Sequence, residues 1–133
     1  MSVRSDLETR LQLWADSQSP KLKIAWEGKA FQKPTSGVFL QAFIMRAKSR
    51  NSNLSGIDYR EHGLWQISVW GLDGKGSAET EQVAQDLVNL FPVVPKFAQT
   101  SIEQVGTISQ ADIIDGWRVV HVTFPYRKES QTN

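Results

Sequence analysis

The stretch on which the fold prediction depends is Tyr59-Arg60-Glu61-His62-Gly63-Leu64-Trp65-Gln66-Ile67-Ser68-Val69-Trp70. Its second half alternates, with Trp65, Ile67 and Val69 on one parity and the polar Gln66 and Ser68 on the other. A period of two is typical of a β-strand with one buried face. We therefore predict a long strand here, with the parity of Trp65 facing the core.

Upstream of this strand, the sequence predicts one helix and two further strands. Val3, Leu7, Leu11 and Trp14 recur at helical spacing and form one apolar stripe. The helix is expected to end before Pro20, because proline disfavours helical backbone in the residue before it. Residues 22–26 alternate in polarity, and residues 38–45 are rich in β-forming residues, so both segments are predicted strands.

Downstream, a glycine-containing turn at 71–76 precedes a predicted helix at about 77–90. Strands are expected around 101–108 and from 117, after the type I′ turn pair Asp115-Gly116. The predicted order is α-β-β-β-α-β-β. This order indicates an α+β fold, a sandwich of one mostly antiparallel or mixed sheet with two helices on one face.

Length and composition set the limits of this fold. The chain has 133 residues, of which 40% are hydrophobic and 22% charged, as expected of one globular domain. We predict a single domain over residues 1–127. The last residues, 128–133, are polar, and we expect them to fray.

The composition also excludes several classes of function. The 15 basic and 14 acidic residues nearly cancel, which argues against a dedicated nucleic-acid-binding protein. The chain has no cysteine and two histidines, so disulfides, thiolate chemistry and multi-histidine metal cages are excluded. The longest apolar stretch, 38–45, is far shorter than a membrane span, and we expect no signal peptide at the N-terminus.

Charge is unevenly distributed along the chain. Residues 1–60 carry ten basic and five acidic groups, whereas residues 61–133 carry five basic and nine acidic groups. A single fold can mix the two halves on its surface, and the asymmetry then has no consequence. Alternatively, the molecule has two unlike faces, which head-to-tail self-association requires.

Five residues are candidates for an assembly surface. The segment 47–58 is polar and has few apolar anchors, and we expect it to be disordered in an isolated monomer. Trp70 lies on the polar parity of its strand, where an outward aromatic side chain would anchor an interface. The predicted interface residues are the four cations in and beside the segment, together with this tryptophan: Arg46, Lys48, Arg50, Arg60 and Trp70.

The sequence shows little catalytic equipment. His62 and His121 are interpreted as structural residues, because no nucleophile elbow or similar signature accompanies them. The turn Gly74-Lys75-Gly76 lacks the spacing of a phosphate-binding loop, although the N-terminus of the helix after it offers an anion site. We therefore predict no catalytic, cofactor-binding or metal-binding residues.

Several segments together resemble the lambda-like phage tail terminator proteins of the gpU type. The similar segments are Arg4–Leu11 followed by Ile24–Glu27, then Gly63–Val69, the Gly74–Gly76 turn and the helix ending at Phe91-Pro92, and finally Asp115–Trp117 and Val122–Tyr126. The resemblance covers about residues 4–127 and depends on the order and spacing of these segments. Leu72-Asp73 departs from the pattern, because relatives are expected to carry a proline before the glycine turn.

This resemblance implies a structural role and no enzymatic one. Members of the family form a homo-hexameric ring that caps the head-proximal end of the tail tube, stops its polymerisation and presents a surface to the head-completion protein. It implies a virion protein of the tail, assembled in the host bacterial cytoplasm, without a cofactor, a membrane or sequence-specific DNA contacts. A ring of identical subunits needs two different patches on each subunit.

Two other classes of function stay open on the sequence alone. One is a non-enzymatic module that binds a protein or a small ligand on an α+β sandwich. The other is a small hydrolase, for which His62 or His121 would supply the base.

Overall fold

The computed structural model describes residues 3–18, 21–34, 37–46, 50–51, 58–72, 74, 78–93 and 100–131. Its elements are α1 (Val3–Ser17), β1 (Lys23–Trp26), β2 (Phe39–Arg46), β3 (Arg50–Asn51), β4 (Asp58–Leu72), α2 (Ala78–Leu90), β5 (Thr100–Ile102), β6 (Thr107–Ile108), β7 (Asp112–Ile114) and β8 (Trp117–Gln131). The predicted α+β class and element order are confirmed. The strand predicted at 101–108 is divided into β5 and β6, and the short strands β3 and β7 are additional.

All strands belong to one mixed sheet. Its order is β1-β2-β4-β8, and the short strands β5, β6 and β7 follow one another along the outer edge of β8. The centre is the pair β4 and β8, which run antiparallel over 15 residues each. The pair β1 and β2 is parallel, so the chain between them must cross over the sheet before β2 begins.

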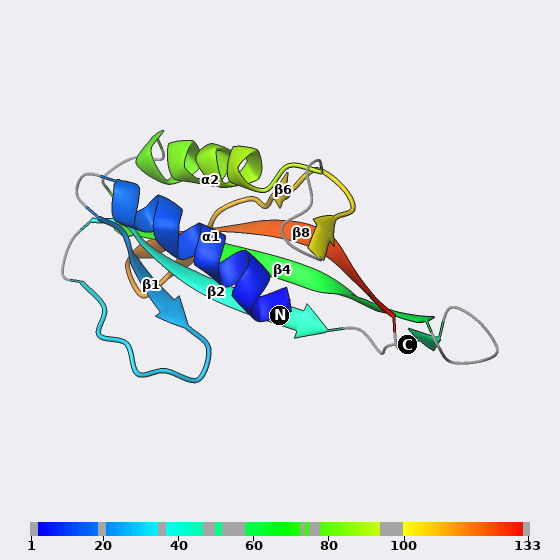
Figure 1. Ribbon diagram of the computed structural model, residues 1–133. Coiled ribbons are helices and arrows are strands. Elements are labelled where there is room, and N and C mark those ends of the chain that lie inside the picture. Colours follow the sequence, from blue (N-terminus) through cyan, green and yellow to red (C-terminus); the bar gives the residue numbers. More distant parts are fainter. Residues whose placement is uncertain are drawn as a thin grey trace.

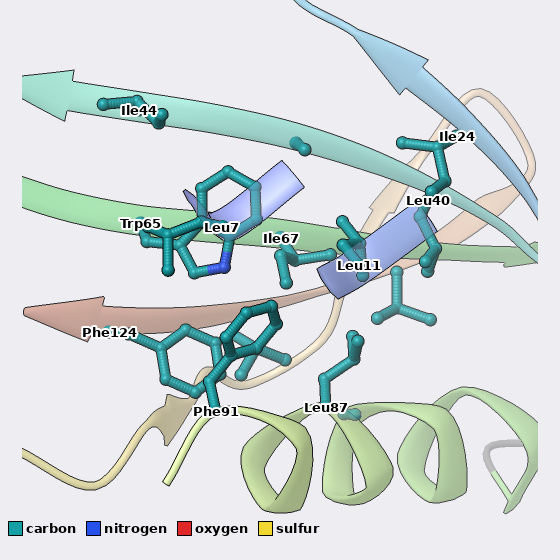
Figure 2. Close-up of a cluster of buried hydrophobic side chains, with 14 of the residues drawn as sticks. Leu7, Leu11, Ile24, Leu40, Ile44, Trp65, Ile67, Leu87, Phe91 and Phe124 are labelled. Carbon is teal, nitrogen blue, oxygen red and sulfur yellow. The ribbon is translucent and has the colours of Figure 1, made fainter. Parts of the chain in front are cut away.

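Both helices cover the same face of the sheet, as predicted (Figure 1). The main core lies between them and the sheet. The labelled side chains of Figure 2 point into it from α1, from four strands and from the end of α2. Trp65, Ile67 and Val69 are fully buried on this face, which confirms the parity predicted for β4. The ring of Trp65 meets Phe91 edge to face, with 5.8 Å between ring centroids.

The opposite face of the sheet carries a second, smaller apolar cluster. Phe39 and Trp117 are buried there, and Phe31 and Trp70 pack against them. Phe31 belongs to the chain between β1 and β2, so this connection crosses the face without helices. The side chain of Phe31 thus helps to cover sheet residues that point away from the main core.

The end of the chain differs from the prediction. Residues 128–131 were expected to fray, but β8 extends to Gln131, which is in register with Asp58 of β4. Polar side chains do not prevent this pairing, because the backbone of β4 supplies a hydrogen-bonding partner along its whole length. Residues 132–133 lie outside the described residues. So do 47–49 and 52–57, most of the segment expected to be disordered, whereas Arg50 and Asn51 form β3.

Glu27 occupies the edge of β2 just beyond the end of β1. Its Oε1 atom accepts a 2.7 Å hydrogen bond from the backbone N–H of Ile44 and one of 3.3 Å from Arg4 Nη2. Arg4 also contacts Glu8 at 2.9 Å. Burial opposes the charge on Arg4, but the two carboxylates outweigh it and raise the pKa of its guanidinium above the ordinary value. Glu27 therefore links α1 to the sheet through Arg4, and it accepts the hydrogen bond of the Ile44 amide at the edge of β2.

Glu27→Ala is expected to lower the free energy of unfolding by about 1–2 kcal/mol, because the amide of Ile44 loses a charged acceptor. Urea unfolding followed by circular dichroism measures the loss. Glu27→Gln is the matched control: its amide oxygen still accepts from Ile44, and only the partly exposed ion pair with Arg4 is lost, which is worth about 0–1 kcal/mol. Equal losses in the two variants would contradict the edge-capping role.

Candidate functional site

The structure places the predicted interface residues in two separate regions. Arg46 ends β2 and is in register with Gly63, whereas Trp70 is in register with Phe39, at the start of β2. Seven residues of strand separate these positions, which corresponds to roughly 23 Å at 3.3 Å per residue. Arg50 and Arg60 lie with Arg46 toward the first end. Lys48 is outside the described residues. The five predicted residues therefore do not form one site.

The first region is a basic end of the sheet, which we define by Arg46, Arg50 and Arg60. Arg46 is exposed. Arg50 of β3 and Arg60 of β4 are register partners, and Arg60 is also in register with Glu129 of β8. The backbone register therefore places these two arginine positions at the end of the sheet where β3, β4 and β8 extend beyond the helices (Figure 1).

The second region contains Trp70, and its neighbours are aromatic. The ring of Trp70 stacks on Phe39, with 5.5 Å between centroids and 14° between the ring planes. Phe39 in turn contacts Phe31 at 5.4 Å and Trp117 at 5.1 Å. Trp70 is half-buried, so one predicted feature is correct: this tryptophan points away from the main core, on the second face of the sheet.

Beside this cluster lies an open depression of about 410 Å³, which we call the aromatic hollow. Its lining combines the second face of β1, β2 and β4 with the crossover: Ala25, Trp26, Glu27, Lys29, Phe31, Lys33, Phe39, Gln41, Phe43 and Trp70. The Nζ atom of Lys33 lies 5.1 Å from the centre of the Trp70 ring, a cation–π contact. The Trp70 indole N–H donates to Gln41 Oε1 at 3.2 Å, which fixes the ring.

Most of this hollow lies outside the residues predicted from sequence. Residues 27–37 are predicted only as a loop, and Lys29, Phe31 and Lys33 have no predicted role. A phenylalanine inside an otherwise polar connection was the available signal. Which face of the sheet it covers depends on the parallel pairing of β1 with β2, which local periodicity does not reveal.

His121 is the residue most suggestive of catalysis. Its Nδ1 atom lies 2.7 Å from Ser68 Oγ, and its Nε2 atom lies 3.8 Å from Asp112 Oδ2. A serine nucleophile must reach a substrate, but Ser68 is only 1% exposed. The other histidine, His62, contacts Glu103 at 3.1 Å. The geometry therefore supports a structural interpretation of both histidines.

Neither metal-binding nor membrane-spanning features are found where the structure is described. Within those residues, no group of three or more His, Cys, Asp or Glu side chains is placed to hold a metal ion. No helix in the same part of the chain is long and apolar enough to cross a membrane.

Comparisons with known proteins agree with an assembly role. One solved structure, titled only with a sequence identifier, superposes with a TM-score of 0.78 at 31% identity, covering 98% of this chain and 96% of that chain. No curated protein sequence matches.

The family model described as "Phage tail terminator protein" matches residues 2–126. The chain therefore belongs to the phage tail terminator family and is a structural component of a bacteriophage tail. The more specific lambda-like, gpU-type subgroup indicated by the motifs stays a prediction.

Proposed function

We propose that copies of this chain form a closed, hexameric ring that caps the head-proximal end of the tail tube. The ring stops addition of tube subunits and offers its other side to the head-completion protein. The observation that carries this proposal is the family match over residues 2–126 of a chain whose surface has two unlike regions, the basic end and the aromatic hollow. Two unlike regions allow one subunit to contact two different neighbours, here the tail tube and another copy of the chain.

In this proposal the protein works by shape and charge, not by catalysis, with residues 1–127 acting as one domain. The burial of Ser68 beside His121 supports the absence of a hydrolytic reaction. The protein is made in the host cytoplasm and stays in the virion tail. DNA passing through the ring would meet only nonspecific charge.

The basic end is the surface that we propose for the tail tube. The strand register places the positions of Arg46, Arg50 and Arg60 toward one end of the sheet, and Lys48 is a fourth basic residue between them in the sequence. Trp70 belongs to a different contact, because it lies in the wall of the aromatic hollow.

The test of this function is tube-length control. Tail tube protein is polymerised alone or with the chain, and tube lengths are measured in electron micrographs. We expect shorter, uniform tubes with a ring at one end, and light scattering of the isolated rings should give six times the monomer mass. Tubes of unchanged length without terminal rings would contradict the proposal.

Arg46→Gln, Lys48→Gln and Arg50→Gln combined should abolish tube capping and leave the melting temperature nearly unchanged, because Arg46 is exposed and charges at a protein surface contribute little to stability. The tube assay and a thermal melt measure the two effects. Lys21→Gln with Lys23→Gln is the control for loss of positive charge outside both the basic end and the lining of the aromatic hollow, and it should still cap tubes. Normal capping by the first triple variant would exclude the basic end as the tube surface.

The main alternative is a protein- or ligand-binding module, and the aromatic hollow is the observation in its favour. The two functions are compatible if the occupant of the hollow is another copy of the chain.

A further inference from the structure

We infer that the turn between β7 and β8 of one copy docks in the aromatic hollow of the next copy. We call this segment, residues 112–116, the isoleucine turn. The inference rests on the proposed ring and specifies which surfaces join its subunits.

The isoleucine turn exposes two apolar side chains that are adjacent in sequence. Ile113 is 55% exposed, and Ile114, the next residue of β7, is 42% exposed. Asp115 and Gly116 have φ angles of 50° and 80°, as in the tight two-residue turn predicted from sequence. The two isoleucines therefore stand at a compact corner of the sheet, held by the pairing of β7 with β8. Exposed apolar groups of this kind mark interaction sites.

The aromatic hollow has the complementary chemistry. Phe31, Phe39, Phe43 and Trp70 supply apolar walls, and its volume of about 410 Å³ is in the size range of about 300–1,000 Å³ found for ligand sites. In many interfaces, the residues that contribute most of the binding energy are side chains that fill such a pocket near the centre of the contact.

Charge favours the same pairing. Residues 100–116 carry Glu103, Asp112 and Asp115 and no basic residue. Residues 21–34 carry four lysines and one acid, Glu27, whose carboxylate already binds Arg4 and the amide of Ile44. The exposed Lys29 and Lys33 at the hollow thus meet the exposed aspartates of the isoleucine turn. Opposite charges steer two such surfaces together and fix their orientation.

The contact must be between copies. The hollow is built on β1, β2 and β4, whereas β7 lies at the opposite edge of the sheet, beyond β8. Because β7 is held in register on β8, the turn cannot fold back into the hollow of its own chain. Each copy therefore carries the isoleucine turn at one edge of its sheet and the aromatic hollow near the other edge. Contacts of this head-to-tail kind form a ring when the rotation that relates one copy to the next closes after a whole number of copies.

The test uses one variant for each surface. Ile113→Asp with Ile114→Asp removes the apolar anchors of the turn, and Lys29→Glu with Lys33→Glu reverses the charge at the hollow. Each double variant should weaken self-association at least ~30-fold, the loss expected for one interface hot spot, and should be monomeric where the wild type forms rings. Analytical ultracentrifugation over a range of concentrations measures this.

Mixing the two variants gives the decisive measurement. The turn variant keeps an intact hollow and the hollow variant keeps an intact turn, so an equal mixture should form one-to-one dimers and nothing larger. Adding Asp112→Lys to the hollow variant should restore part of its self-association. Leu13→Asp is the matched control, because Leu13 is 67% exposed on α1, away from both surfaces, and this variant should assemble normally.

The outcomes separate this inference from the proposed function. If the wild type forms rings and caps tubes, and both double variants assemble equally well, the inference is wrong and the proposed function stands. If the wild type stays monomeric at every concentration and leaves tube length unchanged, both are wrong. Thermal melts exclude unfolding as the cause. Should the turn variant be unfolded, failure of the folded lysine variant to dissociate would by itself overturn the inference.

Discussion

Trp65→Ala is expected to lower the free energy of unfolding by about 3–5 kcal/mol, the usual cost of deleting a large buried aromatic side chain. Trp65 lies in the middle of β4, is fully buried, and meets Phe91 from the end of α2. Its removal leaves a cavity between the sheet and both helices (Figure 2). Because small domains have about 5–15 kcal/mol of stability in total, this loss is large enough to unfold part of the population at 37 °C. Urea unfolding measures it.

Trp65→Phe is the sharper control. The indole N–H of Trp65 is buried and has no hydrogen-bond acceptor among the residues that the structure describes, so phenylalanine removes an unsatisfied polar group while keeping a ring against Phe91. We expect this variant to lose clearly less stability than Trp65→Ala. Trp14→Ala, at a half-buried position of α1, should also cost less. A loss below about 1 kcal/mol for Trp65→Ala would contradict the central place given to this residue.

Phe39→Ala is expected to cost about 3–5 kcal/mol as well, although Phe39 lies on the face without helices. It is 2% exposed and has rings of Phe31, Trp70 and Trp117 around it at 5.1–5.5 Å. The variant should also weaken self-association, because the floor of the aromatic hollow would be lost. Chemical unfolding and sedimentation measure the two effects on the same sample.

Phe43→Ala separates these two effects. Phe43 lines the same hollow from the same strand, but it is only half-buried. Its removal should cost less stability than Phe39→Ala and still weaken the contact between copies. If Phe39→Ala were as stable as the wild type, the second cluster would be a superficial contact and not a core.

The parts of the fold that were predictable from sequence are those fixed by local periodicity. The stripe of Val3, Leu7 and Leu11 and the alternation around Trp65 each specify one buried face, and the structure buries these residues. The parallel pairing of β1 with β2 was not predictable, because it depends on a crossover that local pattern does not encode. The extension of β8 to Gln131 escaped prediction for a related reason: a backbone ladder needs a partner strand, not apolar side chains.

The candidate site was predictable in part for the same physical reason. Trp70 was identified from its parity alone, and its surroundings agree with that interpretation. The rest of the hollow comes from a crossover that folds onto the sheet from a distance in sequence. The charge asymmetry of the two halves was visible in composition, but its meaning depends on sheet order. That order puts β1, which lies in the lysine-rich segment 21–34, and β7, which lies in the acidic segment 100–116, on opposite sides of the central pair of strands.

The carboxylate of Glu27 has one more implication for the proposed function of ending a polymer. An open strand edge is a template on which further chains can add without limit, and a terminator that stacked on itself in this way would sequester copies in fibres before any tail needed one. By occupying the amide of Ile44, the side chain closes that route at this position. In the proposed ring, self-association then proceeds only through contacts that close on themselves at a fixed number of copies.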